Sequence, residues 1–279
     1  MDEDLKRVVL VGGSGFIGTA IEAKLSQLNV SVLKIDSKTV DLLDQSAEEK
    51  LKSIIKLNDA IVMLAALTPD RGRDVVTFTK NIQMLEVVIR VAIDINSSHF
   101  VYVSSDAVYG SQTGIINESS ALNPVDLYGA MHLSRELMLK RLLPIPTMIL
   151  RPTMVYGNGD THDAYGPNRF LRTSKSNREI TLFGKGEEIR DYISIEDIAK
   201  IVSLVLIRKC TGILNLATGK SITFSSIAKE IIRNEKNLVT IRNASRTNKI
   251  FHRHFDITNF IKLFPGYQFK KLEQYLGSK

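Results

Sequence analysis

The chain has 279 residues, of which 44% are hydrophobic and 24% are charged, so the composition predicts a folded globular protein. The single cysteine, Cys210, excludes an internal disulfide, and no apolar run reaches the ~20 residues of a membrane helix. The net charge of +7 is compatible with an anionic partner, but the basic residues are scattered and form no RNA-binding motif. The acidic start, Met1-Asp2-Glu3-Asp4, does not resemble a secretory signal. We therefore expect a cytoplasmic protein with no nucleic-acid or membrane partner.

Strand-length apolar runs alternate with helix-length amphipathic stretches through the first half of the chain. In chain order, the pattern predicts a strand at 7–11, a helix at 19–28, a strand at 30–35, a helix at 46–56, a strand at 60–64, a helix at 77–95, a strand at 100–103, a helix at 128–143 and a strand at 147–150. Unbroken apolar strands of this kind are buried on both faces of a parallel sheet. The predicted fold class is therefore α/β, with a doubly wound parallel Rossmann sheet.

The pattern is less regular after Arg151. It predicts a loop at 157–168, a helix at 194–209 and a returning strand at 213–217. We expect residues 1–152 and 190–217 to form an NAD(P)-binding Rossmann domain. The remaining segments, 153–189 and 218–279, would form a small C-terminal substrate-binding lobe.

A glycine-rich segment follows the first predicted strand and opens the first predicted helix. Gly12 suits a tight turn, Gly15 allows a pyrophosphate to approach the backbone, and Gly18 allows the helix to pack closely on the strand. Phe16 and Ile17 fall at the start of the helix, where free N–H groups and a partial positive charge favour phosphate. The segment predicts a dinucleotide site.

Asp36 lies at the end of the second predicted strand, 18 residues after Gly18. An acid at this place hydrogen-bonds the 2′-hydroxyl of the adenosine ribose and repels a 2′-phosphate. The predicted cofactor is therefore NAD, although Lys38 follows closely and leaves NADP open.

Several ordered motifs resemble those of the extended short-chain dehydrogenases/reductases, also called the NAD-dependent epimerase/dehydratase family. The resemblance covers nearly the whole chain and rests on the GxxGxxG turn, Asp41-Leu42, Leu64-Ala65-Ala66, Asn81, SSDAVYG at 104–110, RPTMVYG at 151–157 and RDYISIEDIA at 190–199. The family pattern implies that Asp41 and Leu42 lie at the adenine. It also implies that the segment 64–66 and Asn81 lie beside the cofactor, with Met63 where histidine is common.

In this family a serine and a tyrosine act on a hydroxyl or carbonyl of the sugar part of a nucleotide-linked sugar. The resemblance assigns these roles to Ser105 and to Tyr128, 23 residues further along the chain. Four residues after the tyrosine the family carries a lysine, which lowers the tyrosine pKa and holds the nicotinamide ribose. Residues i and i+4 share a helix face, and here that position is His132.

The histidine leaves several interpretations open. A charged imidazole would lower the tyrosine pKa, a neutral one would still bind a ribose hydroxyl, and Arg135 on nearly the same helix face is a candidate for the missing cation. In a further alternative, catalysis is lost and the chain is a non-catalytic NAD(P)-binding sensor.

Candidate substrate-binding residues are Asp106, Asn168, Arg169 and Arg190, since arginine suits the diphosphate of a nucleotide sugar. The sugar 4,6-dehydratases carry a glutamate base after the aspartate, but Ala107 follows here. We therefore expect a nucleotide-sugar epimerase or reductase that transfers hydride at the sugar C4. The alternative is a 4-keto-sugar reductase of deoxysugar synthesis, and either would serve polysaccharide biosynthesis. The family resemblance implies a homodimer, and no residue pattern predicts a metal site.

Overall fold

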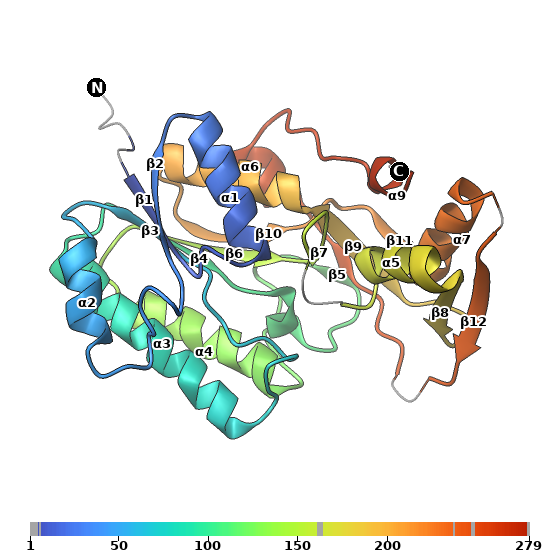
Figure 1. Ribbon diagram of the computed structural model, residues 1–279, viewed down its shortest axis with the longest axis horizontal. Coiled ribbons are helices and arrows are strands. Elements are labelled where there is room, and N and C mark those ends of the chain that lie inside the picture. The colour runs from blue at the N-terminus through green and yellow to red at the C-terminus, as the bar shows by residue number, and fades with distance from the viewer. Residues whose placement is uncertain (1–4, 6, 161–163, 237, 247–248, 278–279) are drawn as a thin grey trace. The chain divides into compact units, whose positions relative to one another are not determined.

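One six-stranded sheet organises the first part of the molecule, with the strand order β10-β6-β4-β3-β1-β2 (Figure 1). Its strands are β1 (Arg7–Val11), β2 (Ser31–Ile35), β3 (Ala60–Met63), β4 (His99–Val103), β6 (Thr147–Pro152) and β10 (Gly212–Leu216). The pairs β1–β2, β1–β3, β3–β4 and β4–β6 are parallel. The strand order reverses at β1, which is the doubly wound arrangement, so the predicted fold class is confirmed.

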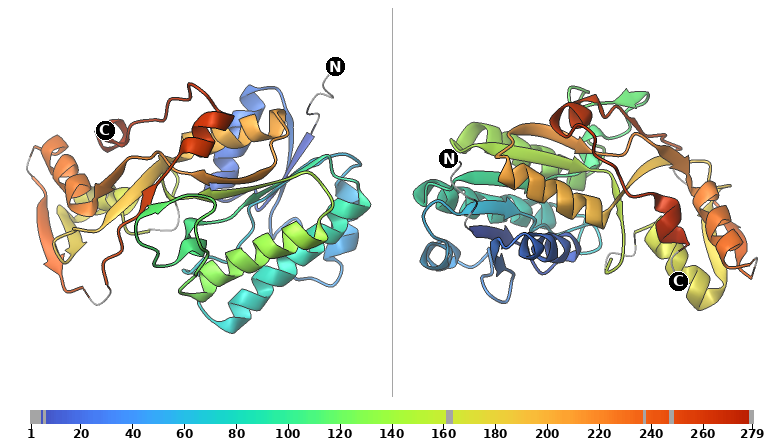
Figure 2. Two further views of the ribbon diagram at one scale, coloured as in Figure 1. Left: turned by 180° about the vertical axis from the view of Figure 1, so that it is seen from behind. Right: turned by 90° about the horizontal axis from the view of Figure 1, so that it is seen from above.

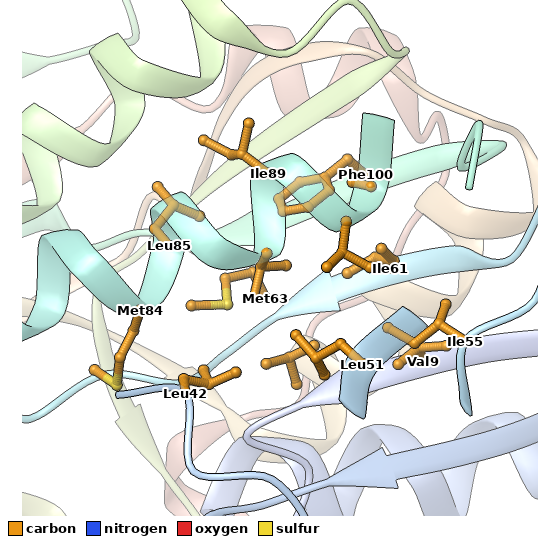
Figure 3. Packing of buried hydrophobic residues seen from close by; sticks show 14 of the residues in the cluster. Val9, Leu42, Leu51, Ile55, Ile61, Met63, Met84, Leu85, Ile89 and Phe100 are labelled. Atoms are coloured by element: carbon orange, nitrogen blue, oxygen red, sulfur yellow. The ribbon is translucent and has the colours of Figure 1, made fainter. Parts of the chain in front are cut away.

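Helices cover both faces of this sheet. On one face lie α2 (Ala47–Ile54), α3 (Val75–Asp94) and α4 (Leu127–Leu142), and on the other lie α1 (Phe16–Gln27) and α6 (Ile195–Ile207) (Figure 1). α3 and α4 run side by side (Figure 2). Between the sheet and the first group of helices is a cluster of buried side chains that includes Val9, Leu51, Ile61, Leu85 and Phe100 (Figure 3). Burying each such side chain contributes about 1.5–3 kcal/mol to folding, so this cluster stabilises the packing of the helices on the sheet.

The computed structural model describes residues 5, 7–160, 164–236, 238–246 and 249–277. The chain divides into two compact units. The first comprises 1–110, 121–152 and 198–214, and the second comprises 111–120, 153–197 and 215–279. Among the described residues, none of the helices combines the length and the apolar character that a membrane crossing requires.

The second unit contains more regular structure than the sequence pattern predicts. Its strands are β5 (Ile115–Ile116), β7 (Met154–Tyr156), β8 (Glu179–Phe183), β9 (Ile189–Ser194), β11 (Ser221–Thr223), β12 (Thr240–Ala244) and β13 (His254–Phe255). Its helices are α5 (Pro167–Asn177), α7 (Phe224–Asn234), α8 (Thr258–Leu263) and α9 (Leu272–Leu276). The predicted loop at 157–168 therefore ends two residues too late, because Pro167 opens α5 at a position that proline favours.

Three segments assigned to the Rossmann domain from the sequence, 111–120, 190–197 and 215–217, belong to the second unit. The reason is strand pairing. β5 pairs with β13, and β9 pairs with β7 and β11, so backbone hydrogen bonds hold the first two segments within the second unit. The third segment begins in the last two residues of β10, where the chain leaves the large sheet.

Candidate active site

The glycine-rich turn joins β1 to α1 in the first unit. Gly12 has a φ of +87°, and a Cβ there would lie 2.6 Å from the backbone nitrogen of Ala65. A Cβ on Gly18 would lie 2.5 Å from the carbonyl oxygen of Gly13, so only glycine lets α1 pack this closely on the turn. Gly15 is exposed, and Phe16 and Ile17 are partly exposed, at a helix start that carries no side-chain cap. These N–H groups are placed as an anion site requires.

Asp36 follows β2 and forms a tight turn. Its Oδ1 accepts hydrogen bonds from the backbone nitrogens of Lys38 at 3.0 Å and Thr39 at 3.1 Å. These bonds lower the pKa of the carboxyl, so Asp36 stays charged at neutral pH. Nearby, Asp41 is exposed, whereas the Leu42 side chain packs in the hydrophobic cluster of Figure 3. A contact of Leu42 with adenine stays a prediction.

The segment Leu64-Ala65-Ala66 follows β3 and lies against the glycine turn. The backbone nitrogens of Leu64 and Ala65 donate to the carbonyl of Val11, at 2.8 and 2.9 Å. Asn81 on α3 holds the far end of this loop, since its amide accepts from the Leu67 nitrogen and donates to the Leu67 carbonyl. The Asn81 side chain is thus occupied by the protein itself, and its effect on a cofactor would be exerted through the loop.

Ser105 and Tyr128 meet at the carboxyl end of β4. Ser105 follows the strand and caps the 3₁₀ turn η1 (Asp106–Tyr109), and Asp126 caps α4 through the Gly129 nitrogen at 2.8 Å. A Cβ on Gly129 would lie 2.6 Å from the Ala107 carbonyl oxygen, so this glycine lets α4 approach η1. The hydroxyl of Ser105 then hydrogen-bonds Tyr128. The structure therefore brings together the two predicted catalytic hydroxyls.

Tyr128 is a weak acid in this environment. Burial raises its pKa to about 12, while the Ser105 hydrogen bond and the positive charge of Arg135 act in the opposite direction. His132 packs edge-on against the Tyr128 ring, with 4.6 Å between ring centroids. Burial and the Arg135 charge lower the pKa of His132 to about 3. The histidine is therefore neutral at pH 7, which leaves the ribose-binding role open to it but not the role of a cation.

Arg135 is a positive charge at the centre of the first unit, with 0% of its surface exposed. Its Nε donates to the Asn81 carbonyl and its Nη1 to the Ala65 carbonyl, both at 2.9 Å. In the described part of the chain it has no carboxylate partner, which is unusual because buried charges are normally paired. The next residue, Glu136, instead forms a bidentate pair with Arg151 through bonds of 2.9 and 2.6 Å.

This second pair was missed in the sequence analysis. Arg151 belongs to the RPTMVYG motif, and its Nη1 also donates to the Tyr109 hydroxyl at 2.8 Å. Ser104 donates to Glu136 at 2.7 Å. The polar positions of SSDAVYG and RPTMVYG are thus joined through one glutamate on α4. The sequence signal for this pair was Arg151 itself, which directly follows an apolar predicted strand. An arginine that is buried at such a position requires a buried acid as its partner.

The predicted substrate residues are distributed over both units. Asp106 lies in η1 beside Ser105, in the first unit. In the second unit, the amide of Asn168 accepts from the Gly157 nitrogen and donates to Asp160, and it lines a cleft together with Arg172 and Lys175. Arg169 is exposed, also on α5. Arg190 pairs with Glu188 and donates to the Phe251 carbonyl, so much of its donor capacity is used internally.

The residues of the first unit fit a dinucleotide. An uncapped helix start with glycines where a Cβ would collide or crowd provides a phosphate cradle. A charged carboxylate stands at the end of β2, and Nε2 of the buried His132 has no partner among the described residues. Within these residues, no cluster of three or more His, Cys, Asp or Glu side chains is placed to hold a metal ion.

Comparison with known proteins gives consistent matches. A dTDP-D-glucose 4,6-dehydratase of Dictyostelium discoideum is 25% identical over 272 residues, which cover 82% of this chain and 62% of that protein. The chain thus spans less than two thirds of that relative. An uncharacterized UDP-glucose epimerase of Bacillus subtilis is 28% identical over 229 residues, 72% of each chain. The fold matches that of a Bacillus cereus UDP-glucuronic acid 4-epimerase with a TM-score of 0.83, at 21% identity and with 97% of this chain and 96% of the other covered.

The model of one protein family, described as the NAD dependent epimerase/dehydratase family, matches residues 8–217. The match covers all six strands of the large sheet, the glycine turn and the Ser105–Tyr128 pair. The predicted family is thereby confirmed: the chain belongs to the NAD dependent epimerase/dehydratase family and is an NAD-dependent enzyme of the extended short-chain dehydrogenase/reductase type.

Proposed function

We propose that this enzyme is a nucleotide-sugar 4-epimerase, with Tyr128 as the group that moves the proton of the sugar O4. The observation that carries the proposal is the hydrogen-bonded pair of Ser105 and Tyr128, in the same unit as the dinucleotide cradle. The named activities of the Bacillus subtilis relative and of the Bacillus cereus structure support the epimerase direction. Ala107 replaces the glutamate base expected of a 4,6-dehydratase, which argues against water elimination.

Each residue has a chemical role in this proposal. NAD, when bound, supplies a hydride acceptor and, in its reduced form, a hydride donor for C4. Ser105 donates a hydrogen bond to O4 and keeps it beside the phenol. In its phenolate form Tyr128 accepts the O4 proton as C4 is oxidised, which leaves the phenol, and it returns that proton on reduction; the Arg135 charge favours the phenolate. Asp106, which follows Ser105 in η1, would contact the sugar in this proposal.

The test is to quantify NAD released on denaturation and to assay C4 inversion. We expect the purified enzyme to release nearly one NAD per chain, because an epimerase regenerates its cofactor in every cycle. It should also interconvert UDP-glucose and UDP-galactose, followed by NMR of the sugar, without added NAD. Weak activity on this pair together with faster inversion of a UDP-hexuronic acid or UDP-acetamidosugar pair would still support the proposal.

Two other results would contradict it. If the enzyme releases little NAD and consumes external NADH with a nucleotide-linked 4-keto-sugar, it is a reductase. If it holds NAD but converts none of these sugars in either direction, the sensor interpretation replaces the epimerase one.

The choice of NAD over NADP is proposed to rest on Asp36. Replacing Asp36 by serine removes a permanent negative charge from the end of β2. We expect the Kd for NADP to fall at least about tenfold, since opposing like charges costs several kcal/mol, while the Kd for NAD rises. Isothermal titration with each dinucleotide measures both values.

Asp44→Ser is the matched control for this experiment. Asp44 also accepts from a backbone nitrogen and a hydroxyl two residues further on, both from Ser46, so its loss perturbs a similar turn. We expect its NADP affinity to stay at the wild-type value. Equal gains in NADP binding for both variants would show that the general charge of the surface, and not Asp36, sets the preference.

A further inference from the structure

Three polar side chains lie close together inside the first unit. Tyr102 lies on β4, and His132 and Arg135 lie three residues apart on α4. The Tyr102 hydroxyl is 2.6 Å from Nδ1 of His132, and the positive charge of Arg135 acts on the same hydroxyl. All three are almost completely buried, with exposures of 1%, 2% and 0%. Solvent therefore cannot exchange these partners freely.

The direction of the hydrogen bond between Tyr102 and His132 follows from the chemistry of the groups. A guanidinium has donors only, so Arg135 offers the Tyr102 hydroxyl no acceptor, whereas Nδ1 of His132 lies within hydrogen-bonding distance. The single proton of the Tyr102 hydroxyl is then available for Nδ1 of His132, which accepts it. A neutral imidazole carries one proton, and that proton must therefore be on Nε2. The arrangement therefore begins at Arg135, which stays positively charged, and ends at His132, whose Nε2–H is a hydrogen-bond donor.

The electrostatics agree with this assignment. Burial raises the pKa of Tyr102, which keeps its hydroxyl protonated and able to donate. The pKa of His132, lowered to about 3 by burial and by Arg135, keeps the ring neutral. A protonated ring would direct a second N–H at the Tyr102 oxygen, whose own proton would then need another acceptor.

The last group in this arrangement, Nε2 of His132, has no partner within the described residues. Nε2 of His132 is buried and unbonded, and the ring contacts the catalytic tyrosine Tyr128 edge-on. Buried donors without an acceptor are rare, because the lost hydration is not replaced. An Nε2–H held in one orientation by the Tyr102 hydrogen bond indicates that an oxygen atom of a ligand completes the arrangement.

We propose that Tyr102 is a positioning residue, which together with Arg135 fixes His132 as a neutral Nε2–H donor to a hydroxyl oxygen of the bound dinucleotide. The inference rests on the proposed function only in requiring the dinucleotide, and not in the identity of the sugar. It divides two tasks between two side chains: His132 supplies a neutral hydrogen bond, and Arg135 supplies a fixed positive charge near Tyr128.

The first test is the tautomer of His132, read from two-bond proton–nitrogen NMR correlations of enzyme labelled with ¹⁵N-histidine. The chain has five histidines, and the signals missing from His132→Gln identify this one. We expect the pattern of a protonated Nε2 and a bare Nδ1 in enzyme from which any bound NAD has been removed, and a shift of Nε2 when NAD is restored. A protonated Nδ1 in the wild-type enzyme, or an Nε2 signal that NAD leaves unchanged, would overturn the proposal.

The second test removes the Tyr102 hydroxyl. Tyr102→Phe should convert the single tautomer of His132 into a mixture and raise the Kd for NAD about tenfold, the loss expected for one well-placed hydrogen bond. Tyr156→Phe is the control, because Tyr156 is equally buried but donates to the Lys270 carbonyl in the second unit. A Tyr102→Phe enzyme with an unchanged tautomer and unchanged NAD affinity would refute the positioning role.

If Tyr102→Phe does not fold, the wild-type spectra alone still decide the tautomer and the response to NAD. Failure of the epimerase proposal would be visible separately. In that case NAD would shift Nε2 as expected, while no sugar nucleotide would be converted.

Discussion

Tyr128→Phe is expected to lower kcat about 100- to 10,000-fold, the range associated with loss of a positioned acid–base group. The substitution keeps the ring that packs edge-on against His132 and removes only the hydroxyl that bonds Ser105. NAD content and the thermal unfolding temperature should therefore stay close to those of the wild-type enzyme. Steady-state kinetics of the C4 inversion measure the effect.

The control for this variant is again Tyr156→Phe, which removes a buried hydroxyl from the second unit. It should retain kcat within about threefold, because single neutral hydrogen bonds contribute modestly. If Tyr128→Phe kept more than a tenth of the wild-type kcat, another group would have to carry the proton. Asp106, beside Ser105 in η1, would then be the next candidate.

Glu136→Gln is expected to lower the free energy of unfolding of the first unit by about 3–5 kcal/mol, as is typical when one member of a buried ion pair is removed. The exposures of the Arg151 and Glu136 side chains are 1% and 0%. Loss of the carboxylate charge leaves the guanidinium with the Tyr109 hydroxyl and a neutral amide. Urea denaturation followed by circular dichroism measures the change.

The double variant Glu136→Leu/Arg151→Met separates charge from packing. Apolar replacements of a whole buried pair are often neutral or stabilising, so the double variant should be more stable than Glu136→Gln. Glu48→Gln is the exposed control: its carboxylate pairs with Lys52 and Arg90 at the surface, and we expect a loss of no more than about 1 kcal/mol. A loss that small for Glu136→Gln would mean that the buried pair contributes little to stability.

Much of the first unit could be predicted because its strands are apolar throughout. A run such as RVVLV at Arg7–Val11 is buried at nearly every position, and a parallel sheet is the usual place for it. The second unit offered no comparable signal. β12 is exposed along most of its length, and β5 and β13 pair over only two residues each, so neither shows a readable period.

The site was predictable where chemistry depends on residues close together in sequence. The glycine turn is indicated by its spacing after a strand, and Ser105 and Tyr128 are indicated by the family resemblance; all of them lie in one unit. Tyr102 could not be found in this way, since a tyrosine in the apolar run HFVYV reads as a core residue. Its function depends on contacts with α4 that only the folded chain provides, as does the internal use of Asn81 and Arg190.

Arg135 also ties a loop to two helices. From α4 its guanidinium holds the Asn81 carbonyl of α3 and the Ala65 carbonyl of the loop after β3. Connecting loops are ordinarily the least stable parts of such a fold. A loop that is already ordered in the free enzyme loses little conformational entropy when a ligand binds, so more of the contact energy appears as affinity. The heat-capacity change of dinucleotide binding should then reflect the surface covered, without a contribution from loop folding.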